Sequence, residues 1–438
     1  MFIALTSTSQ TLRIFGSSSW ADPRTSFIMK FMRKSLLATF ALCLSALAFA
    51  QDMTAEAKDE VLKGLDKVIA ERVFVPGVDL KKWPEFATKH REAIDKATTI
   101  DDFSREVNRA LREFGFSHIR LRTPRSAQSR GRTFVVGPGF NARYENETLV
   151  VVSVTKDSPA ETVGLKAGDV IVEVDGKAPT SASSLSGDEN TELTIKVKRE
   201  GEEPKELKVQ RKRISTVRPE TLTMVGDDAA VLRVYTFSTG YDRKNLEKLI
   251  GEATTKAKFL VLDLRSNGGG AVNNLQHLLS LLLPPDTAVG TFISKNTFQR
   301  YLDETKKDGS NLAEVAAWSE RKYKTSKREV PHFPGKIAVL TNRASASASE
   351  ICAAALRENL KAPIVGQQTA GAVLASVYAR LPQGFELQHP TSDYVTIKGM
   401  RLEGNPLKPD AEVTGRPADG KDPVVDKALE MLRQLIDK

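Results

Sequence analysis

The spacing of apolar residues divides the chain into regions with different predicted secondary structure. Apolar residues recur every three or four positions from Val61 to Ile69 and from Phe103 to Phe114, which is typical of helices. Residues 51–125 are therefore predicted to form a small helical N-terminal unit. From Val135 the pattern changes to short apolar runs separated by turn residues, which is typical of strands.

These short runs between residues 130 and 213 predict a mostly β domain. Apolar runs at 149–154 and 170–174 are predicted strands, and the stretch SPA between them, at 158–160, has the composition of a helix start. Two further runs, at 193–197 and 207–209, are joined by a Gly- and Pro-containing turn and predict a closing hairpin.

From residue 214 to 438, predicted strands and helices alternate. This alternation favours an α/β core with a partly parallel sheet and with active residues at strand ends. Residues 284–334 are polar and less regular, and no element is predicted there. The predicted elements are strands at 230–237, 259–264, 337–340 and 364–365, and helices at 241–257, 273–283 and 349–359.

The beginning of the chain has the three parts of a secretory signal peptide. Lys30, Arg33 and Lys34 precede a short apolar run, which closes with AFA at 48–50, so cleavage is predicted before Gln51. Initiation at Met29 or Met32 fits this arrangement better than Met1, so residues 1–28 are expected not to be translated. No later apolar stretch is long enough to span a bilayer, and the mature protein is expected to be exported, periplasmic or extracellular.

Charge and cysteine content narrow the function classes. Removing residues 1–50 takes away five basic groups and one acidic group and lowers the formal net charge from +9 to +5. The remaining charge is mildly basic, without an arginine-rich helix, and does not indicate nucleic acid binding. Cys43 leaves with the signal peptide, so Cys352 is left alone and no internal disulfide is expected. Scattered histidines indicate no metal site, and no cofactor is expected.

Two short segments at strand ends carry the candidate chemistry. The sequence TNRASASASE, at 341–350, lies between a predicted strand and a predicted helix, where free N–H groups can stabilise an oxyanion. By itself this pattern favours a helix N-cap, because serine is a preferred capping residue. The second segment, DLRSNGGG at 263–270, follows a strand, and its glycines let backbone N–H groups approach a reacting atom.

In this order, DLRSNGGG and TNRASASASE resemble the C-terminal processing (tail-specific) serine peptidases and their tricorn-core relatives. The resemblance implies an α/β peptidase core of the ClpP/crotonase-like type with Ser347 as the nucleophile. Ser345 and Ser349 are then structural alternatives. The N–H of Ala348, together with that of Gly268 or Gly269, is implied to form the oxyanion hole.

The resemblance also bears on the general base. The processing peptidases carry a lysine where this chain has Ala372. Tricorn-type relatives instead use a histidine and a glutamate, and the segments GFSH and RLEGNPLKPD of this chain resemble theirs. His118 is therefore the expected base and Glu403 its orienting partner. His389 remains a rival, and so does a displaced lysine, Lys361 or Lys398.

Residues 130–213 resemble the PDZ domain that is inserted in processing peptidases. Such a domain binds a polypeptide C-terminus as an added strand. The resemblance implies a peptide-binding site and, as partners, unfolded or flexible C-termini. Pro138 lies in the implied carboxylate loop and has no N–H to donate. The implied site residues are Gly137, Gly139, Phe140, Leu165 and Ile171.

Two function classes follow from these patterns. The first is an exported serine endopeptidase that cleaves unstructured polypeptides recruited by their C-termini. The second is an inactive peptidase fold that serves as a peptide-binding adaptor. Ser347, the glycine loop, His118 and Glu403 together favour the enzyme, whereas Ala372 favours the adaptor.

Overall fold

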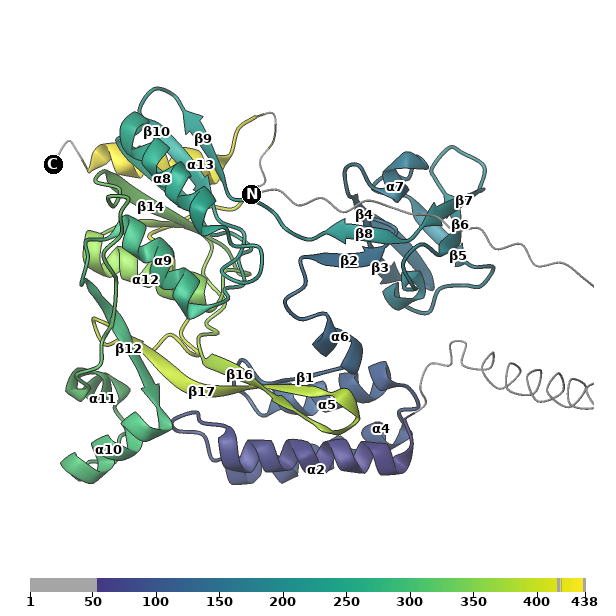
Figure 1. Cartoon of the computed structure of the whole chain (residues 1–438), viewed down its shortest axis with the longest axis horizontal. Coiled ribbons are helices and arrows are strands. Elements are labelled where there is room, and N and C mark those ends of the chain that lie inside the picture. Colours follow the sequence, from purple (N-terminus) through teal and green to yellow (C-terminus); the bar gives the residue numbers. More distant parts are fainter. Residues whose placement is uncertain (1–52, 416–417, 419, 436–438) are drawn as a thin grey trace, which may run out of the picture. The chain divides into compact units, whose positions relative to one another are not determined.

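The computed structural model describes residues 53–415, 418 and 420–435 (Figure 1). The predicted signal peptide and its cleavage site lie outside the described residues. Within the described ranges, no helix combines the length and apolar character that a membrane span requires.

The N-terminal unit is helical, as its periodicity predicted. Thr54 and Thr99 cap its two longest helices by accepting hydrogen bonds from backbone N–H groups. The buried faces of these helices pack against Phe385 and Leu387 from much later in the chain. The elements are α2 (Ala55–Arg72), η1 (Leu80–Lys82), α3 (Trp83–Lys89), α4 (Arg91–Lys96), α5 (Ile100–Glu113), β1 (Arg120–Arg122) and α6 (Pro124–Gln128).

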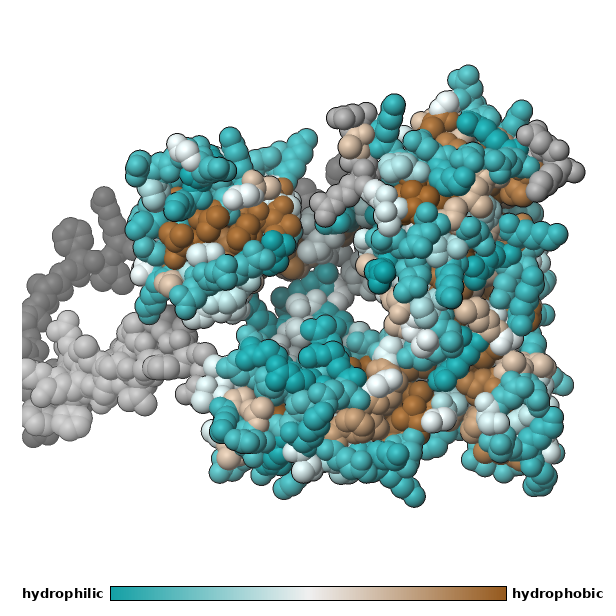
Figure 2. Space-filling view, turned by 180° about the vertical axis from the view of Figure 1, so that it is seen from behind, coloured by the Kyte–Doolittle hydropathy of each residue, from teal (hydrophilic) through white to brown (hydrophobic). Residues whose placement is uncertain are grey.

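The next region forms a five-stranded antiparallel sheet in the order β3-β4-β5-β6-β7, beside a pair made by β2 and β8. Strand β3 lies at an edge of the larger sheet. Figure 2 shows apolar side chains gathered on one side of this domain, whereas the surface over the N-terminal helices is mostly hydrophilic. The elements are β2 (Phe134–Gly137), β3 (Phe140–Glu145), β4 (Thr148–Val154), α7 (Pro159–Thr162), β5 (Val170–Val174), η2 (Ala182–Leu185), β6 (Glu192–Lys198), β7 (Lys205–Gln210) and β8 (Lys212–Ser215).

The core that follows is an α/β layer structure, in agreement with the predicted alternation. Its sheet has the order β18-β15-β14-β11-β10-β9, and all neighbouring pairs except β9 with β10 are parallel. Helices α8, α9 and α12 pack on one face and α13 on the other. The elements are β9 (Thr221–Val225), β10 (Ala229–Arg233), α8 (Arg243–Lys256), β11 (Phe259–Asp263), α9 (Val272–Leu282), β14 (Lys336–Thr341), α12 (Ala348–Leu360), β15 (Ile364–Gly366), β18 (Ala411–Glu412) and α13 (Pro423–Gln434).

A second sheet, which the sequence patterns did not predict, joins distant parts of the chain. Its order is β1-β17-β12-β13, and β16 also pairs with β17 in an antiparallel sense. Part of this sheet and two helices come from residues 284–334, for which no element was predicted. The elements are β12 (Ala288–Ser294), α10 (Lys295–Thr305), α11 (Leu312–Trp318), β13 (Tyr323–Lys324), β16 (Ala375–Arg380), η3 (Pro382–Gly384) and β17 (Glu386–Thr396).

The antiparallel pairing of β1 with β17 matters for the site. It pairs Arg120 with Gln388 and Arg122 with Glu386, and so attaches the end of the N-terminal unit to the C-terminal half of the chain. His118 lies two residues before β1 and is carried with it. The histidine segment therefore approaches the core because of a strand pairing and not because of its neighbours in sequence.

Candidate active site

Ser347 lies between the end of β14 and the start of α12, as the strand-to-helix pattern predicted. Its backbone has φ 57° and ψ −119°, a conformation that costs a non-glycine residue about 1–3 kcal/mol. Its N–H holds this conformation by donating to the Ala372 carbonyl at 3.0 Å and to Glu350 Oε2 at 3.1 Å.

The buried Glu350 carboxylate connects the serine loop to the segment at 369–372. Its two oxygens accept hydrogen bonds from the Thr369 hydroxyl at 2.5 Å, from the Gly371 N–H at 2.8 Å and from the Ala372 N–H at 3.0 Å, in addition to the bond from Ser347. Burial of a carboxylate is tolerated when its oxygens are satisfied in this way. Glu350 thus fixes the backbone on both sides of Ser347.

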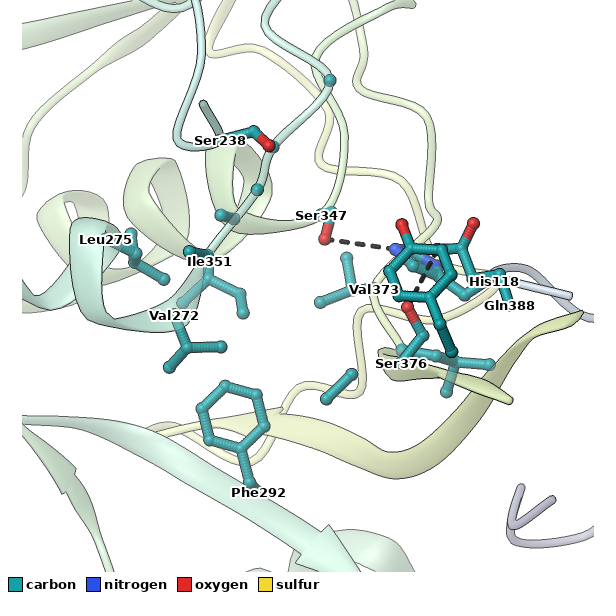
Figure 3. A pocket seen from close by; sticks show the side chains of 18 residues that line it. His118, Ser238, Val272, Leu275, Phe292, Ser347, Ile351, Val373, Ser376 and Gln388 are labelled. Carbon is teal, nitrogen blue, oxygen red and sulfur yellow. Dashed lines mark hydrogen bonds between the residues drawn. The ribbon is translucent and has the colours of Figure 1, made fainter. Parts of the chain in front are cut away.

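The other two serines of the segment have structural partners. Ser345 is fully buried, and its hydroxyl donates to the Leu264 carbonyl at 2.8 Å. Ser349 is also fully buried, and its hydroxyl donates to the Asn267 carbonyl at 2.8 Å. Both therefore tie the start of α12 to the glycine loop, and Ser347 is the serine that faces the pocket (Figure 3).

The structure brings His118 to Ser347. The His118 Nε2 atom lies 3.2 Å from the Ser347 Oγ atom, although the two residues are 229 positions apart. The turn that presents the imidazole includes Gly115 at φ 96°, and His118 itself has φ 58°. Such left-handed backbone conformations are rare outside glycine and often occur at functional sites.

Glu403 reaches His118 through Ser117, a residue that sequence reasoning missed. The Glu403 carboxylate accepts hydrogen bonds from the Ser117 N–H, from the Ser117 hydroxyl and from the Val373 N–H, at 2.8, 2.8 and 2.7 Å. The Ser117 Oγ atom in turn lies 2.7 Å from His118 Nδ1. Ser117 belongs to the motif GFSH, but nothing in the sequence distinguishes its hydroxyl from that of an ordinary serine in a turn.

This chain of hydrogen bonds determines the histidine tautomer. The Ser117 hydroxyl has one proton and donates it to the carboxylate, so its oxygen must accept from His118 Nδ1–H. The Nε2 atom then carries the free lone pair and accepts the Ser347 hydroxyl proton. The order Glu403, Ser117, His118, Ser347 is chemically consistent from end to end.

Burial and charge have opposite effects on His118. Burial lowers the pKa of its imidazole below the ordinary value of 6.5, and the nearby Glu403 carboxylate raises the pKa in part. The net shift is downward, so the imidazole is neutral at neutral pH. A neutral imidazole is the form that can accept a proton.

The rival bases lie elsewhere. His389 is buried, and its Nδ1 atom meets the Pro390 carbonyl at 3.4 Å. Lys361 is exposed at the C-cap of α12, and Ser347 is the N-cap of the same helix, so about 20 Å of helix separates them. Lys398 is exposed, and its N–H donates to Glu358 in the last turns of that helix.

The glycine loop packs directly against Ser347. A Cβ atom on Gly269, which has φ 91°, would lie 2.7 Å from the Ser347 Cβ atom and 2.9 Å from the Ala348 nitrogen. The Gly269 N–H donates to the Asn267 side chain at 3.0 Å. Within the described part of the chain, the N–H groups of Gly268 and Ala348 have no such acceptor, which leaves these two for an oxyanion.

A pocket of about 470 Å³ opens beside Ser347. Figure 3 shows two kinds of lining on its two sides. Apolar side chains come from α9, β12 and α12, whereas His118, Ser376 and Gln388 form a polar side. The side chains labelled there from these three elements are Val272, Leu275, Phe292 and Ile351, and Val373 is a further labelled apolar side chain.

The predicted peptide-binding residues separate into two groups. Gly137, Gly139 and Phe140 line a groove of about 670 Å³ that also includes η2. Leu165 and Ile171 are buried in the core of the domain and do not line this groove. Their apolar character is therefore explained by packing. Across the described ranges, no group of side chains is arranged to hold a metal ion.

Comparison with known proteins finds similarity in two parts of the chain. Residues 228–413 match peptidase family S41, and residues 150–199 match the PDZ domain. Proteins described as CtpA-like serine proteases are 25% identical over 284 residues in Staphylococcus haemolyticus and 28% identical over 286 residues in Staphylococcus aureus. Both alignments cover 64% of this chain and 52% of the relative, so the chain spans about half the length of the curated relatives that it matches.

Solved structures share the fold. An S41 protease from Bacteroides fragilis is 16% identical, with a TM-score of 0.51 over 85% of this chain and 97% of that one. Mature CPAF complexed with lactacystin is 14% identical, with a TM-score of 0.51 over 87% and 98%. The chain is therefore similar to peptidase family S41 over residues 228–413 and to the PDZ domain over residues 150–199.

Proposed function

We propose that this protein is a serine endopeptidase that cleaves unstructured polypeptides. The observation that carries this proposal is the 3.2 Å contact between His118 Nε2 and Ser347 Oγ, with the imidazole held in the accepting tautomer by Ser117 and Glu403. A nucleophile, a base and an orienting group in hydrogen-bond reach are what acyl transfer requires.

The proposed reaction has two steps. Ser347 Oγ attacks the carbonyl carbon of the peptide bond while His118 Nε2 takes its proton, and the oxyanion forms between the Gly268 and Ala348 N–H groups. His118 then donates the proton to the leaving amine. Water, deprotonated by the same imidazole, hydrolyses the acyl-enzyme and frees Ser347.

The pocket suggests which bond is cleaved. Its apolar side, formed by Val272, Leu275, Phe292 and Ile351, suits an apolar side chain next to the cleaved bond. Burial of such a side chain stabilises the complex by about 1.5–3 kcal/mol. A charged side chain at this position would lose its hydration without finding a partner there.

The PDZ domain is proposed to recruit substrates by their C-termini, and the mature protein is proposed to act after export. Support for the first point is the free edge of β3 beside the groove, where an added strand can pair. Support for the second is the signal-peptide pattern before Gln51.

A fluorophosphonate probe tests the enzyme against the second candidate, an inactive peptide-binding adaptor, which Ala372 favours. Purified mature protein should be labelled at Ser347 and should degrade casein. Ser347→Ala should lose both, whereas Ser345→Ala should keep labelling at Ser347 in whatever fraction remains folded. Absence of labelling in the unaltered, folded protein would favour the adaptor.

A further inference from the structure

A hollow of about 680 Å³ between α5 and β1 is lined by arginines. It is distinct from the catalytic pocket described above, and its walls include two arginines from the helix and two from the strand. Asp101 is the one carboxylate of the lining. The arginines are Arg105, Arg112, Arg120 and Arg122.

Most of these guanidinium groups are available for a ligand. Arg105 pairs with Asp102 and Glu106. For Arg112 and Arg120, which are both exposed, the described part of the chain offers no ion-pair partner. Arg122 donates through Nη2 to the Ser126 carbonyl at 2.6 Å, and its buried Nε atom has no acceptor among the described residues.

Strand register connects this hollow to the catalytic pocket. Gln388 of β17 pairs with Tyr378 of β16 on one side and with Arg120 of β1 on the other. Residues directly opposite one another in antiparallel strands share a face. Tyr378, Gln388 and Arg120 therefore form a row across one face of the sheet, and Gln388 lines both cavities.

Positive charge also lies beside Tyr378 in this row. The guanidinium of Arg130 lies 4.3 Å and that of Arg122 5.6 Å from the centre of the Tyr378 ring. Arg130 forms an ion pair with Glu386, with 3.2 Å between Nη2 and Oε1. The opposite face of the strands, with Ala379, Leu387 and Leu121, is buried in the N-terminal core and is unavailable. A chain leaving the catalytic pocket along the polar face thus reaches unpaired arginines.

We propose that this arginine-lined hollow binds an acidic segment of the polypeptide substrate while the cleaved bond lies at Ser347. The inference rests on the proposed peptidase function and adds to it a preference for Asp or Glu residues near the cleaved bond. Carboxylates are favoured ligands because guanidinium groups bind them with paired hydrogen bonds.

The test uses internally quenched peptides that share one apolar residue before the cleaved bond. One series has three Glu residues before that residue, another has them after the cleaved bond, and each has a counterpart with Gln in their place. We expect at least one Glu peptide to have a kcat/KM about tenfold above its Gln counterpart, chiefly through KM. The ratio should fall towards one as salt rises from about 0.05 M to about 0.5 M.

Three variants separate charge from structure. Arg112→Gln combined with Arg120→Gln should bring the Glu-to-Gln ratio close to one. The matched pair Arg112→Lys with Arg120→Lys keeps the charge and should retain most of the preference. Arg321→Gln removes an exposed arginine outside both cavities and should leave the ratio unchanged.

Equal kcat/KM for Glu and Gln peptides in the unaltered protein would overturn this inference and leave the proposed function standing. An undiminished ratio in the double Gln variant would also overturn it. Failure to cleave any peptide, together with absence of fluorophosphonate labelling, would instead contradict the proposed function itself.

Discussion

At the scale of single residues, the site depends on a hydroxyl between the carboxylate and the imidazole. The resemblance implied Glu403 as the orienting partner of His118. The structure has Ser117 between them, and this serine donates to the carboxylate while it accepts from Nδ1–H. In the proposed mechanism Ser117 is thus a positioning residue, since it acts on Ser347 only through the histidine.

Replacing Ser117 tests this role. Ser117→Ala should lower kcat by roughly 10²- to 10⁴-fold, because the imidazole is no longer held in the accepting tautomer. Ser117→Thr keeps the hydroxyl and should restore much of the rate. Ser129→Ala, an exposed serine on the same segment, is the matched control. A full rate in Ser117→Ala would show that the hydroxyl has no such role.

The pH profile tests the charge on His118. Because the net shift of its pKa is downward from 6.5, the acid limb of kcat/KM should have its midpoint below pH 6.5. Glu403→Gln removes the charge that raises this pKa. The acid limb of Glu403→Gln should therefore move to still lower pH, while its maximal rate falls. A midpoint above pH 6.5, or an upward shift of the midpoint in the variant, would contradict His118 as the base.

At the scale of elements, the loop after β11 and the start of α12 are built as one unit. Ser345 and Ser349 bind carbonyl groups of the β11 loop, and Gly269 leaves no room for a side chain against Ser347. Each segment alone is a common strand-end loop. Their contact determines where the nucleophile points.

Gly269→Ala should therefore abolish fluorophosphonate labelling. The added Cβ would lie 2.7 Å from that of Ser347 and would need a positive φ, so the loop has to move. Gly251→Ala is a suitable control because Gly251 lies within α8 and its Cβ would meet open space. That control should keep full labelling and gain about 0.5–1 kcal/mol in the free energy of unfolding, measured by denaturant titration.

The edge strand of the PDZ domain supports a second prediction at this scale. One unfolded reporter with Ala-Ala, Asp-Asp or amidated C-termini should be cleaved fastest with Ala-Ala, since Phe140 contributes an apolar wall to the groove beside β3. Because Pro138 cannot donate a hydrogen bond to the terminal carboxylate, binding should be weak, with a Kd of about 1 μM or more. Indistinguishable cleavage rates for the three reporters would mean that the domain does not read the terminus.

At the scale of the whole molecule, the hydrophobic cores show which parts can fold alone. The PDZ core contains residues from β3 to β7 only. The N-terminal helices share their core with Leu374, Ala379, Leu381, Phe385 and Leu387 of the second sheet. The PDZ domain therefore has a core of its own. The N-terminal helices, by contrast, have a core that is complete only with residues from the C-terminal half.

Truncation should follow these cores. A fragment of residues 130–218 should unfold cooperatively on heating, as followed by circular dichroism. A chain lacking residues 53–123 should aggregate, because it exposes the apolar face of β16 and β17. The opposite pattern, a PDZ fragment without a cooperative transition beside a soluble truncated core, would contradict this division.

The sequence alone was sufficient to predict those elements whose pattern lies within one short stretch of the chain. The buried strand before TNRASASASE, the helix after it and the alternation of the core follow from apolar spacing, and the structure has them within a few residues. The helical N-terminal unit follows for the same reason. By contrast, β12 and β17 belong to a sheet whose partners are far apart in sequence, so no window of the sequence shows it.

Only the tertiary structure decided how distant groups meet. Motif resemblance named Ser347, His118 and Glu403, but their distances depend on the pairing of β1 with β17, which no local pattern encodes. The same pairing inserts Ser117 into the hydrogen-bond chain and puts Arg120 in a row with Gln388. Side-chain periodicity determines which face of an element is buried, whereas pairing between strands determines which faces meet. The arrangement of the candidate site depends on the pairing between strands.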